Sequence, residues 1–168
     1  MGYDVTIRIL EPPGLLNLRA GASARPPIEA TLGRALPREP NSTAECNGLL
    51  LLCLGPDEWL LRTSDGAEIA WAAQLQRAAA GTPCAVTPVS DAYTAFEDSG
   101  PEACEVLRQG TGIDLHPRSF GPGRCARTRF AKTRALLYQA DTEPTYQVYV
   151  PLSYAQYLMQ WFEHCRGG

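Results

Sequence analysis

The stretch "LGPDEWLL" (residues 54–61) interrupts the most apolar run of the chain with a proline and two acidic residues. Residues 49–54 before the interruption and residues 59–62 after it are almost entirely apolar. Pro56 has its φ angle preset for the second position of a β-turn, and Asp57 suits the third position. The stretch therefore predicts a β-hairpin, in which two apolar strands are joined by this turn.

The two adjacent acids of the turn, Asp57 and Glu58, allow a second interpretation. They could act as a general acid/base pair or clamp a metal ion. Neighbouring carboxylates on an exposed turn usually stay solvated, however, and so short a motif is weak evidence on its own. We therefore interpret the turn as an architectural feature.

The composition of the whole chain is that of an ordinary globular protein, with 168 residues, 45% of them hydrophobic and 20% charged. No run approaches the roughly 20 apolar residues of a membrane span, and the N-terminus lacks the pattern of a signal peptide. The net charge of −3 argues against nucleic acid as a partner. We expect a cytoplasmic protein that binds neither membranes nor nucleic acid.

The cysteines indicate neither a disulfide framework nor a zinc site, because they form no C-x-x-C pair and follow no secretory signal. We expect reduced thiols at all six positions, which are Cys46, Cys53, Cys84, Cys104, Cys125 and Cys165.

The first half of the chain contains alternating, irregular and helical patterns. Residues 3–10 alternate as a half-buried strand, and "GLLNL" (residues 14–18) is expected to pair with them. Residues 20–47 are rich in proline and have no periodic apolar face, which predicts a long irregular segment. A helix is expected after cap candidates at Ser64 and Asp65, and its apolar residues recur at helical spacing: Ile69, Ala72, Leu75 and Ala79.

The second half is plainer. Residues 85–100 alternate as one strand, and the sequence from Ser99 predicts a short helix that ends at Gly110. "RCARTRFA", "RALLYQA" and "TYQVYV" predict three more strands, and a final amphipathic helix begins near Ser153.

Two regions of the chain share one plan. Residues 59–75 and 146–162 each contain a strand that closes a hairpin, a polar cap region and a helix with one apolar stripe. A helix laid on an antiparallel sheet, twice over, predicts an α+β fold of two similar layers. We expect a single domain over 1–168 whose similar halves cover about 1–81 and 82–168.

Residues that could carry catalysis are few. His116 and His164 are the only histidines, and neither has a serine, cysteine or acid at a spacing that indicates a catalytic set. The chain has no glycine-rich phosphate loop, and Lys132 is its only lysine. The sequence predicts no catalytic, cofactor-binding or metal-binding residues.

Basic residues gather between positions 118 and 134, where the chain carries five arginines. Guanidinium groups suit carboxylates, phosphates and ion pairs at interfaces. Three interpretations remain open: a solvated face, an acidic surface on a partner protein, and a polyglutamyl or phosphate ligand. We expect a subunit interface at Arg118, Arg124, Arg127 and Arg129.

Three blocks carry a resemblance to a known family: "LGPDEWLL", the segment from "VSDAYTAFEDSG" to "GRCARTRF", and "YQVYVPLSYAQYLMQWF". In the order and spacing of these blocks, from about Leu49 to Cys165, the chain resembles the gamma subunits of heterotetrameric sarcosine oxidases. The match of residues 1–48 is loose. The resemblance implies the fold of the folate-binding aminomethyltransferases (T-proteins), in agreement with the two-layer expectation.

The resemblance further implies a complex that oxidatively demethylates sarcosine to glycine, with tetrahydrofolate as the one-carbon acceptor and hydrogen peroxide as a product. Alpha, beta and delta subunits would be the partners, mainly alpha. FAD, FMN, NAD, tetrahydrofolate and zinc would be held by those subunits and none by this chain. The T-protein's catalytic aspartate has no counterpart in "AKTRALL" (residues 131–137), which contains no acid.

Two hypotheses from different classes follow. The first is a non-catalytic gamma subunit of a sarcosine oxidase, or the equivalent subunit of a related N-methyl amino acid dehydrogenase. The second is a free-standing folate-binding, aminomethyltransferase-like protein. The missing acid and the missing redox motifs favour the first hypothesis.

Overall fold

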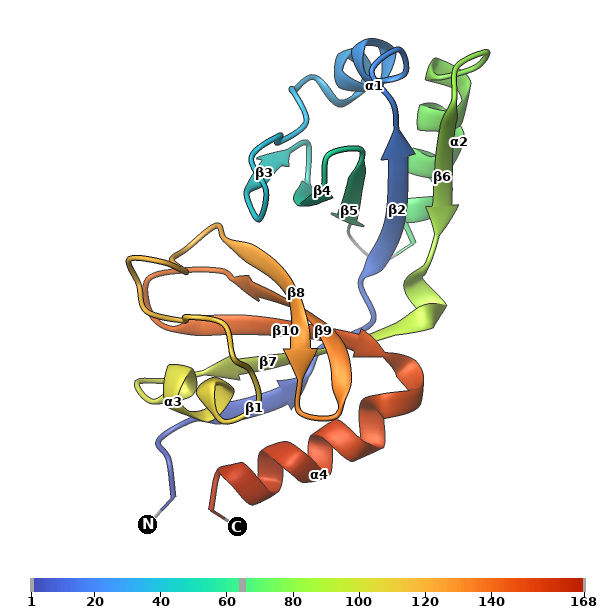
Figure 1. Ribbon diagram of the computed structural model, residues 1–168. Coiled ribbons are helices and arrows are strands. Elements are labelled where there is room, and N and C mark those ends of the chain that lie inside the picture. The colour runs from blue at the N-terminus through green and yellow to red at the C-terminus, as the bar shows by residue number, and fades with distance from the viewer. Residues whose placement is uncertain (1, 64–65, 168) are drawn as a thin grey trace. The chain divides into compact units, whose positions relative to one another are not determined.

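The computed structural model describes residues 2–63 and 66–167, and these form two compact units (Figure 1). The central unit is Pro12–Ser90, and the terminal unit combines Met1–Glu11 with Asp91–Gly168. The chain thus starts in the terminal unit, builds the whole central unit and then returns.

The central unit is a five-stranded antiparallel sheet with two helices on one face. Its strand order is β3-β4-β5-β2-β6. In chain order its elements are β2 (Gly14–Ala20), α1 (Arg25–Leu32), β3 (Thr43–Cys46), β4 (Leu49–Gly55), β5 (Glu58–Thr63), α2 (Glu68–Ala78) and β6 (Cys84–Pro88).

The terminal unit repeats this design with the strand order β1-β7-β10-β9-β8, again fully antiparallel. Its elements are β1 (Thr6–Ile9), β7 (Tyr93–Ser99), α3 (Ala103–Arg108), β8 (Cys125–Phe130), β9 (Thr133–Gln139), β10 (Thr145–Pro151), the 3₁₀ turn η2 (Leu152–Tyr154) and α4 (Ala155–Cys165). A second 3₁₀ turn, η1 (Ser90–Ala92), precedes β7.

Each unit has its own core between the sheet and its helices. The central core is largely aliphatic, and Leu51, Leu61 and Leu75 are completely buried in it around Trp59. The terminal core is aromatic: the ring of Phe162 lies 5.5 Å from that of Phe96 and 5.9 Å from that of Phe130. Such pairs add about 0.5–1.5 kcal/mol beyond the burial of their area.

The hairpin predicted from "LGPDEWLL" is confirmed, because β4 and β5 are antiparallel partners joined at Pro56 and Asp57. The shared plan of the two halves is confirmed as well. β10 and α4 begin 87 residues after β5 and α2, respectively. The α+β class with two similar layers is therefore the observed fold class.

The proline-rich segment 20–47 differs from the irregular segment expected, because it contains helix α1 and strand β3. Pro26 and Pro27 occupy the first turn of α1, where a missing N–H costs nothing, and Gly33 ends the helix with a φ of 69°. The prolines thus begin a helix here. The expectation that they prevent regular structure was wrong.

Two strand expectations were also wrong. Residues 6–9 pair with β7 of their own unit, whereas "GLLNL" pairs with β5 and β6. Pro12 and Pro13, which lie between the two strands, favour an extended chain over a tight reversal. The alternating run 85–100 is not one strand either. Pro88 closes β6, and β7 begins in the other sheet after η1.

The division of the chain lies at residues 11/12 and 90/91 rather than near 81/82. Helix α2 forms as predicted, but Ile69 is 62% exposed and does not belong to its buried stripe. The cap candidates Ser64 and Asp65 lie outside the described residues. Within the described ranges, no helix is long and apolar enough to cross a membrane.

Candidate functional site

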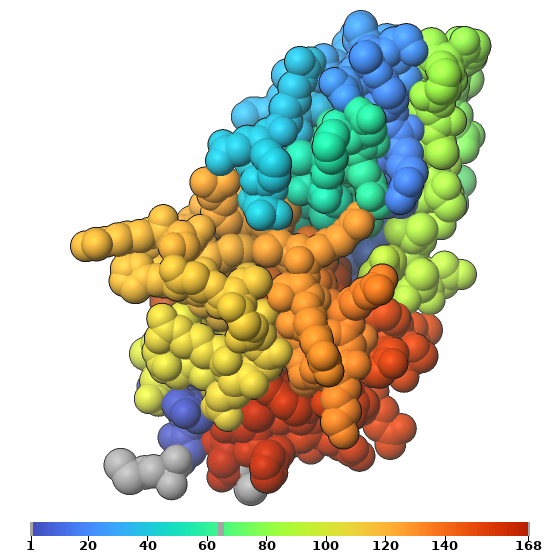
Figure 2. Space-filling view, viewed as in Figure 1, coloured from blue at the N-terminus to red at the C-terminus, as the bar shows by residue number. Residues whose placement is uncertain are grey.

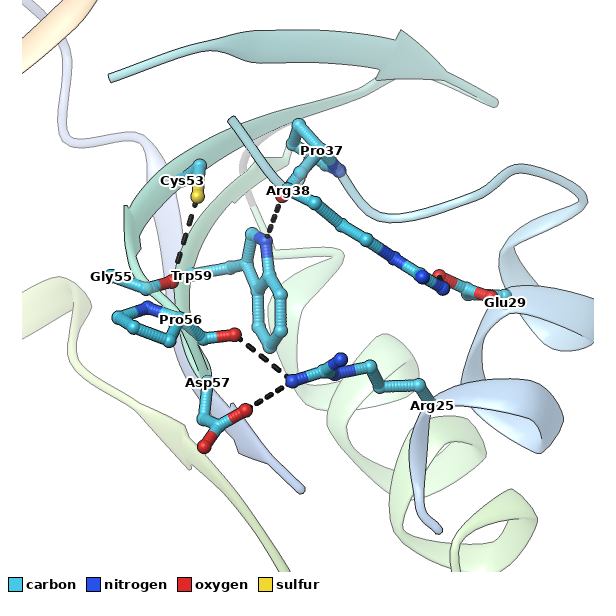
Figure 3. A network of polar contacts seen from close by, with 9 residues as sticks. All are labelled: Arg25, Glu29, Pro37, Arg38, Cys53, Gly55, Pro56, Asp57 and Trp59. Atoms are coloured by element: carbon cyan, nitrogen blue, oxygen red, sulfur yellow. Dashed lines mark hydrogen bonds and ion pairs between the residues drawn. The ribbon is translucent and has the colours of Figure 1, made fainter. Parts of the chain in front are cut away.

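The turn of the "LGPDEWLL" hairpin is held by a cation from helix α1 (Figure 3). Arg25, the first residue of that helix, donates a hydrogen bond of 3.1 Å to the carbonyl oxygen of Pro56 and forms an ion pair with the Asp57 carboxylate. Its guanidinium carbon also lies 5.7 Å from the centre of the Trp59 ring, within the range of a cation–π contact. One side chain thus ties helix, turn and core together.

Trp59 extends this network to the segment after α1 (Figure 3). Its indole Nε1 donates a hydrogen bond of 2.7 Å to the carbonyl oxygen of Pro37, although the residue as a whole is completely buried. Glu29 accepts a hydrogen bond from the backbone N–H of Leu36 and lies 3.5 Å from Arg38. These polar contacts, together with the burial of Leu36 in the central core, order the segment after α1.

Both acids of the turn are engaged by basic or amide side chains. Glu58 accepts a hydrogen bond of 2.9 Å from Asn17 and lies 3.4 Å from Arg19, while Asp57 is paired with Arg25. A general base or a metal ligand needs a free lone pair directed at a reacting group. The arrangement supports the architectural interpretation of the turn and explains why its two acids are tolerated beside a core.

An open depression of about 500 Å³ lies beside the turn, at the ends of β2 and β6. Arg19, Asp57 and Cys84 are among the residues that line it, and no histidine or lysine does. Burial raises the pKa of the Cys84 thiol, which keeps it protonated and weakens it as a nucleophile. The depression holds no acid–base or nucleophilic pair.

The four arginines predicted at an interface are all in the terminal unit. Arg118 is exposed in the loop before β8, and Arg124 is half-buried directly before that strand. Arg127 and Arg129 are exposed on β8 itself, two residues apart and hence on one face of the sheet. β8 is an edge strand. The interface assignment stays a prediction.

Sequence reasoning missed Asp98, a carboxyl group in the core of the terminal unit. Asp98 lies on β7, is 0% exposed, and neither of its carboxyl oxygens has a hydrogen-bond partner among the described residues. Burial raises its pKa to about 8, so the carboxyl is largely protonated at neutral pH. One signal was present: Asp98 follows Phe96 at the strand period and so occupies an apolar position.

Tyr146 is a neighbour of this carboxyl, and Cys104 is in turn a neighbour of Tyr146. Tyr146 is the partner of Asp98 on β10, and burial, followed by the effects of Cys104 and Asp98, raises the pKa of its phenol. Cys104 on α3 contacts the carbonyl oxygen of Leu115 at 3.6 Å. Asp98 and Tyr146 are buried, whereas Cys104 is half-buried, so the carboxyl itself lacks the access that a reacting group requires.

The remaining candidates have structural contacts. His116 accepts a hydrogen bond from the backbone N–H of Arg118, and Asp114 accepts one from Ser119 that lowers the pKa of its carboxyl. His164 lies in the last turn of α4. All six cysteines are free thiols in the structure. In the parts of the chain that the structure describes, no group of three or more His, Cys, Asp or Glu side chains could hold a metal ion.

The class of this protein follows from its fold and not from the residues of a site. The T-protein of the glycine cleavage system from Bartonella henselae, an aminomethyltransferase, superposes with a TM-score of 0.68 over 95% of this chain and 45% of its own, at 17% identity. That likeness shows the fold, which is the aminomethyltransferase-like α+β arrangement.

The family follows from closer comparisons. The sarcosine oxidase gamma subunit family matches over residues 20–167, and the gamma subunit of sarcosine oxidase from Arthrobacter is 32% identical over 84% of this chain and 68% of its own. The heterotetrameric sarcosine oxidase of Corynebacterium sp. U-96 superposes with a TM-score of 0.88 at 30% identity, over 96% of this chain and 83% of the matched chain. The chain belongs to the sarcosine oxidase gamma subunit family.

Proposed function

We propose that this chain is the gamma subunit of a heterotetrameric sarcosine oxidase. The complex oxidises sarcosine to glycine, transfers the released one-carbon unit to tetrahydrofolate and reduces oxygen to hydrogen peroxide. The observation that carries the proposal is the agreement of sequence and structure over nearly the whole chain: the family covers residues 20–167, and the superposition on the Corynebacterium oxidase covers 96% of the chain.

The role proposed for this chain within the complex is structural. The acids of the hairpin turn are engaged in ion pairs, and the one fully buried carboxyl among the described residues, that of Asp98, is closed off from solvent. Such groups support a stable scaffold more readily than a reaction. FAD, FMN, NAD, tetrahydrofolate and zinc are accordingly assigned to the other subunits, and the complex to the cytoplasm.

The partners in this proposal are the alpha, beta and delta subunits, with alpha making most of the contact. The surface assigned to them includes Arg118, Arg124, Arg127 and Arg129. Arginine is enriched at protein interfaces because its guanidinium can bind a carboxylate through two hydrogen bonds. Three of these four residues are exposed, and Arg124 is half-buried.

The test is co-expression of this chain with the three other subunits encoded by its source, followed by purification through a tag on this chain. We expect a four-subunit complex that shows flavin absorbance and produces hydrogen peroxide when given sarcosine. The chain purified alone should be colourless and inactive, and the other three subunits without it provide the matched control.

Several results would contradict the proposal. Flavin absorbance or sarcosine demethylation by the isolated chain would show that it is catalytic. Tight binding of tetrahydrofolate by the isolated chain, with no recovery of partner subunits, would indicate a free-standing folate-binding protein. A complex active on another N-methyl amino acid but not on sarcosine would indicate a related dehydrogenase.

A further inference from the structure

The tip of the β8–β9 hairpin carries three exposed cations. Arg129 on β8 and Arg134 on β9 are directly opposite each other in the strand ladder, and Lys132 lies in the turn between them. We refer to these three residues as the basic tip. In Figure 2 long side chains of the orange hairpin stand out from the surface beside the red C-terminal helix.

The charge of this region is not balanced locally. Residues 115–140 contain five arginines and one lysine but no aspartate or glutamate. Among the described residues, no ion pair includes a member of the basic tip. Like charges directly opposite each other on neighbouring strands are destabilising. Arg129 Nε donates a hydrogen bond of 3.4 Å to the carbonyl oxygen of Ala131, which is uncharged and does not neutralise the guanidinium. An external anion would therefore relieve the repulsion between these cations.

The hairpin holds these cations on a firm base. Phe130, next to Arg129, is completely buried, and its ring lies 4.9 Å from that of Trp161 on α4. A side chain at Gly110 would meet the Phe130 ring at 2.7 Å, which shows how closely the backbone approaches it. The N–H of Ala131 also donates a hydrogen bond of 2.7 Å to the carbonyl oxygen of Gly110. The base is thus anchored to two neighbouring elements, and a ligand need not order it first.

We propose that the basic tip docks an acidic segment of a partner subunit, with the carboxylates of that segment pairing with Arg129, Lys132 and Arg134. This inference rests on the proposed function, because it requires the complex. It extends the predicted interface by Lys132 and Arg134, which the four predicted arginines did not include.

An acidic protein segment fits this surface better than nucleic acid does. A duplex is bound through many phosphate contacts along an extended basic surface, whereas this chain has a net charge of −3 and only three cations at the tip. The tip is also exposed and projecting, and a small anion is normally held in a concave, partly desolvated site. A short acidic segment of a folded partner matches the small size of the basic tip and has the opposite charge.

Lys132 provides a direct test because it is the only lysine of the chain. A carbodiimide joins a lysine amine to a carboxylate only where the two are in contact, with the formal loss of one water. In the intact four-subunit complex, we expect mass spectrometry to find Lys132 coupled to an aspartate or glutamate of another subunit. Lys132→Arg keeps the charge, so it should assemble normally and lose the coupling.

A salt titration provides the second readout. In the variant R129S/K132S/R134S, we expect assembly with the other subunits to weaken about tenfold at roughly 0.05 M salt. The difference from wild type should nearly vanish at about 0.5 M salt, where exposed charges are screened. The matched control R34S/R77S removes two exposed arginines of the central unit and should assemble like wild type. Thermal melting checks that both variants are folded.

The outcomes separate this inference from the proposed function. If the wild-type chain fails to recover the other oxidase subunits, the proposed function fails. If wild type assembles and the triple variant has the same affinity at low salt, the docking inference alone is overturned. Coupling of Lys132 only to carboxylates of its own chain overturns it as well. So does a competition experiment in which added duplex DNA prevents assembly and an added polyglutamate peptide does not.

Discussion

The central and terminal units have the same arrangement of strands and helices, but their cores are built from different types of side chain. The central unit surrounds Trp59 with leucines and satisfies the indole N–H with the carbonyl oxygen of Pro37. The terminal unit packs four phenylalanines and encloses Asp98 without a hydrogen-bond partner among the described residues. The same topology therefore accepts an aliphatic core and an aromatic core. The aromatic core of the terminal unit also encloses Asp98, whose pKa burial raises to about 8.

The edge strand next to β2 or β7 also differs between the units. In the central unit it is β6, which follows α2 along the chain, whereas in the terminal unit it is β1 from the N-terminal end. Both strands complete the same position of the same sheet plan. The backbone hydrogen bonds of the sheet require an antiparallel strand at this position, but that strand can come from different places in the sequence.

The largest expected effect is a pH dependence of stability confined to the terminal unit. Because burial raises the pKa of Asp98 from 3.8 to about 8, the folded state favours the protonated carboxyl. The contribution of Asp98 to the free energy of unfolding is fully present below about pH 4. It is lost as the pH rises toward 8, because the unfolded chain releases the proton more readily than the folded one. A shift of this size corresponds to about 6 kcal/mol across that range.

Asp98→Asn, which is nearly isosteric and cannot ionise, should remove most of this pH dependence. Denaturant unfolding at pH 5, 6, 7 and 8 measures the free energy, and amide hydrogen exchange assigns it to a unit. The amides of β7 and β10 should lose protection as the pH rises, after correction for the intrinsic exchange rate. An equal loss in β2 and β5, or an unchanged slope in Asp98→Asn, would contradict the assignment.

The next largest effects come from truncating one buried aromatic in each core. Trp59→Ala in the central unit and Phe130→Ala in the terminal unit should each cost about 3–5 kcal/mol of unfolding free energy, because each leaves a cavity. Trp59→Phe keeps most of the volume but leaves the carbonyl oxygen of Pro37 without its donor, which costs about 1–3 kcal/mol. Phe130→Leu is the matched substitution without a lost hydrogen bond. If Trp59→Phe were neutral, the tether to Pro37 would have no energetic role.

A smaller effect is expected from the cation that joins α1 to the turn. Arg25→Ala loses the hydrogen bond to the carbonyl oxygen of Pro56, the cation–π contact and the ion pair, for about 1–2 kcal/mol in total. Hydrogen exchange should report the loss in α1 and the turn. Arg25→Lys keeps the charge and should recover part of it. A loss that extended equally to α4 would show that the cation acts on more than the turn.

The smallest effects are expected at the acids of the turn. Asp57 has a side chain that is 62% exposed, and exposed ion pairs contribute about 0–1 kcal/mol. The Glu58 side chain is only 18% exposed, but its partner Arg19 is 66% exposed, so this pair also lies at the surface. Asp57→Ala and Glu58→Ala should therefore assemble normally and leave sarcosine oxidation by the complex nearly unchanged. Loss of activity with unchanged melting would revive the catalytic interpretation of these acids, and the steady-state rate of peroxide formation decides between the two.

Predictions from the sequence succeeded where short-range chemistry is sufficient. The hairpin at Pro56 and the final helix follow from turn residues and periodicity over a few positions. They failed at α1 and at the break between β6 and β7. Periodicity does not reveal that Pro26 and Pro27 belong to a first helical turn, or that one alternating run supplies two different sheets.

The candidate sites divide in the same way. The accumulation of basic residues between 118 and 134 was evident from composition, but the pairing of Arg129 with Arg134 required the register of β8 and β9. The engagement of Asp57 by Arg25 joins positions 32 residues apart, and no local pattern indicates it. Asp98 stood at an apolar position of a strand, yet only packing shows that the group is sealed from solvent and without a partner.

By itself the sequence determined the fold class, the hairpin at "LGPDEWLL", the repeated strand–helix plan and the absence of nucleotide-binding motifs. These depend on residue types within a few positions of one another, which the backbone geometry of turns, strands and helices restricts directly. The tertiary structure alone decided which strands share a sheet, which cations of the described residues lie opposite each other and which of their carboxyl groups is buried. Those properties depend on contacts between distant residues, and desolvation and charge pairing acquire their size only when such residues are brought together.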